Sequence, residues 1–470
     1  MGLTSAFGIS RSGLSTVEKW AETTSANIAN ADKPGYARKA VLRTTDDVGI
    51  VSVNGIRRES DGAIDRMHRR EPARMGRQDA LASGTALYLG QLGSPDDPNS
   101  LSNRVADLQT AFVQLANAPE QISRQNAALT ASEALARDLN AADAALDEAT
   151  LTVQGRVEAS VDAANLAITK IAELNQRIVG VEPGTQQHAM LTDELNIQLD
   201  ALADIVDTRA VFDGAGRASV YTADGSPLVE DNSYELLSFE AATATLSLDG
   251  RDITPGRDGA RGFSEARLAG EIELLREVFP KAQRQIDELA RGLMVGFETA
   301  DATVTAGVAG LFTDDGAAFD PANLDGLAGR IRVNDAVRPI VGGDVWRLRD
   351  GIAAGAEGPP ADGTQLAAFV SMMEGQQTFD AAAGLGTSST LAEFAAALGA
   401  DQQRVRTDAE ELRETFRTSA ASLEATRSSL SGVNVDDELQ QLILIEQSYA
   451  ANSRVITVVS EMVDTLLAAV

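Results

Sequence analysis

Residues 434–470 read NVDDELQQLILIEQSYAANSRVITVVSEMVDTLLAAV and place apolar side chains at the seven-residue spacing of a coiled-coil helix. The positions of this seam are Val435, Leu439, Leu442, Ile445, Tyr449, Asn452, Ile456, Val459, Val463 and Leu466. The same spacing occurs near the other end, at Leu3, Phe7, Ser10, Leu14, Val17, Ala21, Thr24 and Ile28. Because a narrow apolar seam needs a partner helix, we predict that the two ends pair with each other. The middle of the chain would then loop out as further domains.

Both terminal helices have clear boundaries. The first should stop near Asn30, since the Pro34-Gly35 step that follows cannot continue an α-helix. The last should begin at Asn434, a good N-cap residue, and its first turn carries the acidic residues 436–438, which the helix dipole favours. The sequence therefore predicts two defined terminal helices.

The composition indicates a mainly α fold with inserted β segments. The chain has 470 residues, enough for two to four domains, and only 4% are aromatic, which favours long helices packed along narrow stripes. A helical tract runs from about 100 to 205, whereas 211–262 alternates in polarity and contains Asp-Gly turns. Segment 306–360 holds two possible strands, 331–334 and 344–348, and a hairpin is expected around Asn54-Gly55.

The domain organisation follows from this order of helical and β-rich segments. We predict these parts: terminal coiled-coil assembly domain, 1–36 and 434–470; long helical domain, 37–210, 263–305 and 361–433; β-rich outer domain, 211–262 and 306–360.

The chain is strongly acidic, with 40 basic and 69 acidic residues and a formal net charge of −29. Such a field repels phosphate backbones and anionic lipids, so we expect neither nucleic acid nor a membrane as a partner. No apolar run approaches the roughly 18 residues that cross a bilayer. The N-terminus also lacks the basic and apolar regions of a secretory signal. These features fit either the cytoplasm or export by a route that cleaves no signal.

The sequence lacks residue clusters with catalytic or metal-binding spacing. It has no Cys, and its two His, His68 and His188, are not spaced as a metal-binding pair on one helix. No phosphate loop, nucleotide-binding glycine pattern or nucleophile elbow occurs. The acidic pairs 314–315 and 436–437 fall in an expected turn and an expected helix start, which explains them better than acid–base catalysis. We predict that the protein is not an enzyme and uses no cofactor or metal.

Two motifs at opposite ends resemble those of bacterial flagellar axial proteins, the rod, hook and hook-associated family. Residues 25–38, SANIANADKPGYAR, resemble its N-terminal motif, in which Asn-x-x-Asn closes a helix before Gly-Tyr and a basic residue. Residues 446–456, EQSYAANSRVI, resemble its C-terminal motif. The matching positions are Asn27, Asn30, Gly35, Tyr36, Arg38, Asn452 and Arg454.

The middle of the chain narrows this resemblance. Segments 171–178, IAELNQRI, and 428–438, SSLSGVNVDDE, are similar to the hook-associated protein 1 family, although 191–196, LTDELN, lacks the Arg-Asp pair usual there. This resemblance implies an extracellular structural subunit at the junction of hook and filament, which forms a ring through its terminal helices. It also implies contacts with neighbouring copies, the hook protein and hook-associated protein 3. An export chaperone on the C-terminal helix, and export without a cleaved signal, are implied as well.

Several alternatives remain open from the sequence. The chain could be another axial protein, such as hook-associated protein 3 or a hook protein. It could also be a secreted adhesin that binds a ligand through 211–262, although that segment has no aromatic platform or charged cluster. An enzyme is disfavoured by the missing motifs. Asn452 either fixes the register of the terminal coiled coil or lies exposed on a wider helix.

Overall fold

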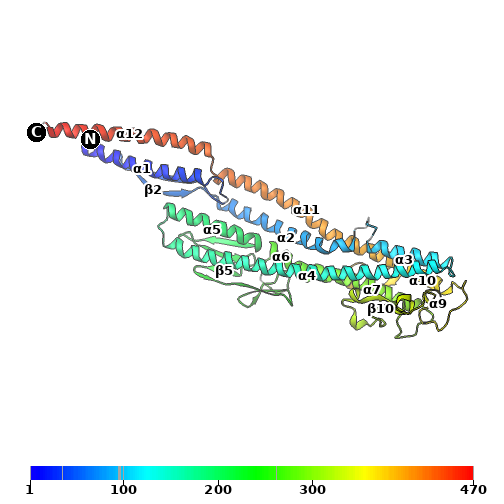
Figure 1. The fold of residues 1–470 in the computed structure, drawn as a ribbon. Coiled ribbons are helices and arrows are strands. Elements are labelled where there is room, and N and C mark those ends of the chain that lie inside the picture. Colours follow the sequence, from blue (N-terminus) through cyan, green and yellow to red (C-terminus); the bar gives the residue numbers. More distant parts are fainter. Residues whose placement is uncertain (1, 34, 94–96, 99, 261, 469–470) are drawn as a thin grey trace.

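The computed structural model describes residues 2–33, 35–93, 97–98, 100–260 and 262–468. The molecule is elongated, and both termini lie at the same end (Figure 1). Its helices are α1 (Leu3–Ala29), α2 (Gly62–Leu92), α3 (Leu101–Ala116), α4 (Ile122–Val179), α5 (Gln186–Ile205), α6 (Arg267–Glu273), α7 (Phe279–Ala300), α8 (Leu327–Arg330), α9 (Arg347–Asp350), α10 (Thr364–Glu374), α11 (Leu391–Ser431) and α12 (Val435–Ala468). Its strands are β1 (Lys39–Thr45), β2 (Val51–Arg58), β3 (Thr208–Phe212), β4 (Ala218–Thr222), β5 (Pro227–Glu230), β6 (Ser233–Tyr234), β7 (Leu237–Glu240), β8 (Thr245–Leu248), β9 (Arg251–Asp252), β10 (Phe312–Asp314), β11 (Ile331–Val333), β12 (Gln377–Thr378) and β13 (Ser388–Ser389).

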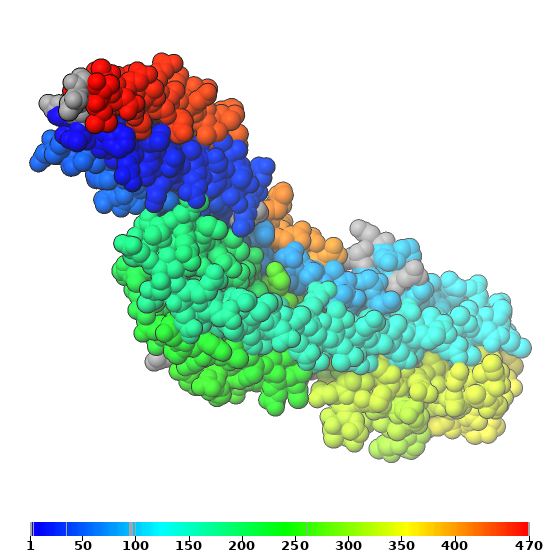
Figure 2. Space-filling model, turned by 60° about the vertical axis from the view of Figure 1, so that its left-hand side comes forward, coloured from blue at the N-terminus to red at the C-terminus, as the bar shows by residue number. Residues whose placement is uncertain are grey.

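The predicted fold class is confirmed: the protein is mainly α with small antiparallel β insertions, and its terminal helices are paired. We call α1, the β1–β2 hairpin and α12 the terminal arm, and the elements from α2 to α11 the body. The arm projects from one end of the body, and Figure 2 shows the paired terminal helices stacked above it. The hairpin packs on α1, so it lies with the arm, although the sequence analysis grouped it with the helical domain.

The body is organised around the 58-residue helix α4. Its buried apolar side chains recur at intervals of three and four residues, as in Leu135, Leu139 and Leu146, and α3 and α5 pack against it as antiparallel neighbours. Near the N-terminal end of α4, which lies away from the arm, the rings of Phe112, Phe297, Phe312 and Phe369 form one cluster with centroid separations of 5.1 to 5.8 Å. The body therefore has a continuous apolar core.

The two β-rich segments attach to different parts of α4. Asn165 and Asn175 bond to the backbone of the first segment, at Leu237 and Ala218, whereas Asn140 donates to carbonyls of the second. Asn140 and Asn165 lie roughly 40 Å apart along the helix, at 1.5 Å per residue. The sheets are accordingly separate, β3-β4-β5-β6 and β7-β8-β9 in one region and β10-β11 in the other. The two segments that the sequence analysis grouped into one outer domain thus share no strand pairing in the described part of the chain.

Two local predictions were wrong. The hairpin turns at 46–50, where the Asp46 carboxylate accepts hydrogen bonds from the N–H groups of Val48 and Ile50. Asn54-Gly55 instead lies within β2, where the register shifts opposite Leu42 and Arg43, so Asn54 is the extra residue of a β-bulge. The expected strand at 344–348 is a turn leading into the short helix α9, whereas 331–333 does form a strand.

Within the body, the helices α2 and α11 form a two-helix stalk that leads to the arm. Helices α2 and α11 pack along each other over most of their length, and the Arg74 guanidinium lies 4.1 Å from the ring centroid of Phe416. Helix α2 continues through Pro72. Helix α11 begins with a capping box in which Thr390 and Glu393 satisfy each other's backbone N–H groups. The stalk leads the chain through Gly432 directly into α12.

Candidate functional site

The terminal arm is the candidate site, and its core is the face of α12 that meets α1. Along α12, Glu438, Ile445 and Val459 are buried, and Leu442, Asn452 and Ile456 are half-buried. On α1, Val17 is buried, and Leu14 and Ile28 are half-buried. The Trp20 indole N–H donates to the Gln441 side chain over 3.0 Å. The two ends of the chain therefore form a real helix pair within one molecule.

Half of the predicted C-terminal seam lies outside this face. Exposed seam positions are Phe7 on α1 and Val435, Leu439, Tyr449, Val463 and Leu466 on α12. Near its start, α12 turns Glu438 toward α1 in place of its neighbour Leu439, because adjacent residues point about 100° apart. The Leu3 side chain lies outside the described residues. The seam is therefore only partly closed by the chain itself.

Asn452 and Gly13 show how closely the helices approach. A Cβ atom added to Gly13 would lie 2.8 Å from Oδ1 of Asn452, so a larger residue there would force the Asn452 side chain to shift. The Asn452 amide donates to the carbonyl of Ser448 in its own helix. Asn452 thus faces α1, while Arg454 is exposed on the outside of α12. Gly13 could have been noticed in the sequence as a small residue within the N-terminal seam.

The N-terminal motif residues converge on one buried carboxylate. Asn27 is 1% exposed and Glu438 is 0% exposed. The Asn27 amide donates to the Lys39 carbonyl and to Glu438 over 2.9 and 3.2 Å, while its oxygen accepts from the Lys39 N–H and the Tyr36 hydroxyl, both over 3.0 Å. Arg38 Nε donates to Glu438 over 2.7 Å. Every hydrogen-bonding position of the Asn27 side chain is filled, so these residues lock α1, β1 and α12 together.

Two further motif residues shape the turn after α1. The Asn30 amide donates to the Ala26 carbonyl over 2.8 Å, and the same carbonyl accepts the Asn30 backbone N–H, so the side chain reinforces the last turn of α1. Gly35 has φ +75°, and a Cβ atom there would lie 2.8 Å from a side-chain carbon of Ile197. A side chain would therefore be strained as well as crowded. The arm thus approaches α5 of the body at this point.

An ion-pair network fills the neck between arm and body, and the sequence analysis did not find it. Asp193 of α5 bonds Lys39 Nζ of β1 over 2.6 Å and Arg58 Nε of β2 over 2.8 Å. Further pairs continue the network: Arg58–Asp65, Asp65–Arg427, Arg427–Asp200 and Arg69–Asp200. The partners come from five different elements and are up to 362 residues apart in sequence, as in Asp65 and Arg427. No local pattern in the sequence could have indicated them.

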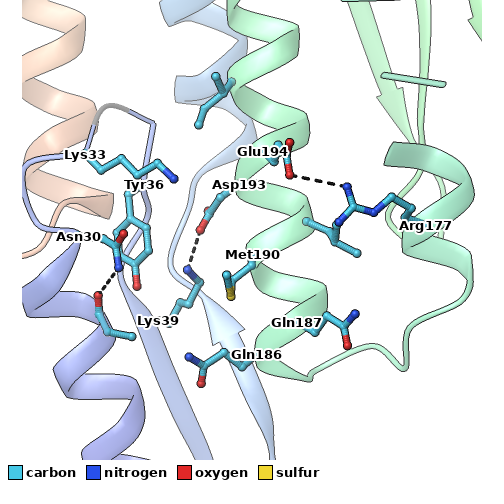
Figure 3. A pocket seen from close by; sticks show the side chains of 13 residues that line it. Asn30, Lys33, Tyr36, Lys39, Arg177, Gln186, Gln187, Met190, Asp193 and Glu194 are labelled. Atoms are coloured by element: carbon cyan, nitrogen blue, oxygen red, sulfur yellow. Dashed lines mark hydrogen bonds and ion pairs between the residues drawn. The ribbon is translucent and has the colours of Figure 1, made fainter. Parts of the chain in front are cut away.

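A pocket of about 490 Å³ lies beside this network (Figure 3). Lys33 and Tyr36 line it from the arm, and Arg177, Met190 and Glu194 line it from the body. Burial, and then the charges of Asp193 and Glu438, raise the pKa of the Tyr36 hydroxyl well above its ordinary value, so it stays protonated and can donate. Burial lowers the pKa of Lys39, and the bond to Asp193 opposes this shift.

Neither histidine forms part of a metal-binding cluster among the described residues. Within those ranges, no group of three or more His, Cys, Asp or Glu could hold a metal ion. His68 Nε2 lies 2.8 Å from Glu424, and His188 Nε2 lies 3.2 Å from the Ala215 carbonyl, so both have structural partners. None of the described helices is long and apolar enough to span a membrane.

Comparison with known proteins gives two family matches. The family described as "Flagellar hook-associated protein FlgK helical domain" matches residues 91–307, and the family described as "Flagellar basal body rod FlgEFG protein C-terminal" matches 426–469. Flagellar hook-associated protein 1 of Bacillus subtilis (strain 168) is 22% identical, and the alignment covers 99% of this chain and 97% of that protein. The flagellar hook junction protein FlgK from Burkholderia pseudomallei superposes with a TM-score of 0.44 and 19% identity, over 53% of this chain and 46% of that one.

The C-terminal family match covers the end of α11 and all of α12, and the helical match covers the centre of the body. Together they indicate similarity to flagellar axial proteins. With the full-length similarity to the Bacillus protein, these matches support a protein of the FlgK type.

Proposed function

We propose that this protein is a structural subunit of the bacterial flagellum that joins the hook to the filament and assembles as a ring through its terminal arm. The similarity to hook-associated protein 1 over 99% of the chain carries this proposal. The partly open seam supports it, because exposed side chains such as Leu439 and Tyr449 remain available to neighbouring subunits. In this role the chain acts by assembly and not by catalysis.

The same proposal assigns the partners. Neighbouring copies would contact the arm, while the hook protein and hook-associated protein 3 would contact the two sides of the ring. An export chaperone would hold α12 before assembly by taking its apolar face into a groove. Export would proceed without a cleaved signal, and the mature protein would lie outside the cell. Residues 1–36 and 434–470 would be the assembly domain.

Locating the protein in purified flagella tests this function. A tagged full-length chain should label one site per flagellum, at the boundary between hook and filament. Deleting its gene should leave hooks without filaments and cells that do not swim. Labelling along the whole hook would instead indicate a hook protein. Labelling only on the filament side of a separate junction protein would indicate hook-associated protein 3, and absence from flagella would overturn the proposal.

A further inference from the structure

Strand β3 is an edge strand, and no group in the described part of the chain bonds to the backbone on its outer side. It lies at one end of the sheet β3-β4-β5-β6 and pairs there with β4. The bonds at the two ends of this pair run from Ala223 N to the Asp207 carbonyl and from Asp213 N to the Arg217 carbonyl, both over 3.0 Å. In an antiparallel pair, residues that bond the partner strand alternate with residues that point outward. The second and fourth residues of β3 therefore bond β4, whereas the first, third and fifth direct their N–H and C=O groups away from the sheet. These outward residues are Thr208, Ala210 and Phe212.

Two residues of β4 confirm this direction. The Thr222 N–H donates to the Ser226 carbonyl over 2.8 Å, on the side of β4 that faces away from β3. The N–H and carbonyl of Ala218 both bond the Asn175 side chain of α4 over 2.9 Å. Thr222 and Ala218 lie opposite the first and the last residue of β3. Since their backbone groups have these other partners, the two β3 residues must direct theirs outward.

Other edges of the first β-rich segment are capped or short. Asn165 of α4 donates to the carbonyl of Leu237 over 2.9 Å and accepts its N–H over 2.8 Å, which caps the outer side of β7. Strand β6, at the far edge of the first sheet, has only two residues. Natural proteins cover, shorten or interrupt sheet edges in such ways because an open edge pairs with other chains. Strand β3 instead has five residues in unbroken register, without proline or lysine, and its last two residues, Val211 and Phe212, are 49% and 44% exposed.

We propose that β3 binds an extended, basic segment of a different protein as an added strand of this sheet. The outward N–H and C=O groups would bond the backbone of that segment, and Val211 and Phe212 would contact its apolar side chains. Charge selects the occupant. Residues 207–262 contain ten Asp and Glu, five Arg and no Lys, and β3 itself lies between Asp207 and Asp213. A second copy of a chain with net charge −29 would bring like charge to this edge, whereas a basic segment is attracted to it. This surface lies on the body, and the inference does not depend on the proposed function.

A synthetic strand tests this edge in the full-length chain. The probe is a short peptide of alternating Val and Thr flanked by Lys, and hydrogen exchange of the protein is followed by mass spectrometry as the peptide is added. We expect saturable binding that slows exchange in 208–212 but not in β8. The same peptide with every backbone nitrogen methylated cannot donate, so it should bind at least about tenfold more weakly. A version flanked by Glu should also bind more weakly, because the edge is acidic.

A proline variant blocks the edge from the protein side. The N–H of Ala210 points outward, so Ala210→Pro removes a donor from the open edge and none from the pairing with β4. Binding of the Lys-flanked peptide should weaken at least about tenfold, while the circular dichroism spectrum stays that of the native chain. The matched control Ala210→Ser keeps the N–H and should bind as the native chain does.

Four results would overturn the proposal. One is no saturable binding of the Lys-flanked peptide to the folded chain. A second is binding that survives both Ala210→Pro and methylation of the peptide, which would place the peptide elsewhere. Equal binding of the Lys-flanked and Glu-flanked peptides would remove the basic partner. Dimers of the free chain in sedimentation, present in the native chain and lost in Ala210→Pro, would assign the edge to a second copy instead.

Discussion

The body and the terminal arm are both helical, but different groups fill their interiors. In the body, large apolar side chains such as Phe112 and Phe297 are completely buried. In the arm, the most deeply buried side chains are polar, Asn27 and Glu438, and much of its apolar surface stays exposed. Apolar burial is the main stabilising term in folding, so the body is complete by itself. The arm is held in a defined geometry by hydrogen bonds and still has apolar surface to offer.

The largest expected effect lies in the body core. Phe297 is fully buried and its ring contacts those of Phe112, Phe312 and Phe369. Phe297→Ala should lower the free energy of unfolding by about 3–5 kcal/mol, because it leaves a cavity. Chemical denaturation followed by circular dichroism measures this. A loss below about 1 kcal/mol would mean that the body is no better packed than the arm.

A buried carboxylate makes the stability of the body depend on pH. Burial raises the pKa of Asp287 to about 6, although the N–H groups of Ala328 and Gly326 and the Gln283 amide bond its carboxylate. Between pH 4 and 6 the folded chain keeps a proton that the unfolded chain loses. The free energy of unfolding should therefore fall as pH rises, by about 3 kcal/mol in total from this group.

Asp287→Asn isolates this contribution. Other buried carboxyls, including Asp143 and Glu271, also have raised pKa values and act in the same direction. Denaturation curves of the native chain and the variant, recorded at several pH values from 4 to 7, give the free energy of unfolding at each pH. This free energy should fall with rising pH more steeply in the native chain, and the difference is the contribution of Asp287. Parallel pH profiles would contradict the assignment.

In the arm, the largest effect should come from a polar residue. Glu438→Ala removes the partner of Arg38 and one of the two acceptors of the Asn27 amide. Since hydrogen bonds to charged groups contribute about 1.5–3 kcal/mol, we expect local destabilisation of about 2–3 kcal/mol. Hydrogen exchange should become faster in α1 and α12 but not in α4. The control Glu446→Ala, an exposed position on the same helix, should change neither region.

The smallest expected effects separate the two faces of α12. Ile445→Ala removes a buried side chain of the seam and should cost the arm about 2 kcal/mol. Leu439→Ala removes an exposed side chain and should change stability by less than about 0.5 kcal/mol. Hydrogen exchange of α1 in the isolated chain measures both. The seam predicted from the sequence includes both residues, whereas in the structure only Ile445 is buried. Equal effects of Ile445→Ala and Leu439→Ala would therefore contradict the observed contact and favour the predicted seam.

Much of the fold could be predicted because its signals are local. Long repeats of apolar residues and Pro-Gly steps identified the terminal helices, and Asp-Gly turns identified the first β segment. Asn54-Gly55 was misleading because this pair suits a β-bulge as well as a hairpin turn. The separation of the two β segments depends on which part of α4 each one contacts, through Asn140 or Asn165. Nothing in the local pattern of either segment records that.

The site was predictable in part for the same reason. The motif residues Asn27, Tyr36 and Arg38 could be recognised from the sequence, and the structure brings them together. Glu438, the partner of Asn27 and Arg38, was interpreted only as a charge favoured at the start of a helix. The ion pair of Lys39 and Asp193 was missed, because the two residues are 154 positions apart and segment 191–196 was compared with the family without a role for the Asp193 carboxylate. The sequence also did not show which side chains of α12 face α1, because a shift of one residue along a helix moves a side chain by about 100°.

The bond between Arg38 and Glu438 joins residues 400 positions apart. A contact of such sequence separation can form only after both ends of the chain are available, and its loop-closure entropy is among the largest in the molecule. Synthesis therefore leaves α1 without its partner helix until the last residues of α12 have emerged, when the domains between them can already be folded. The arm is thus the last part of the chain to take shape.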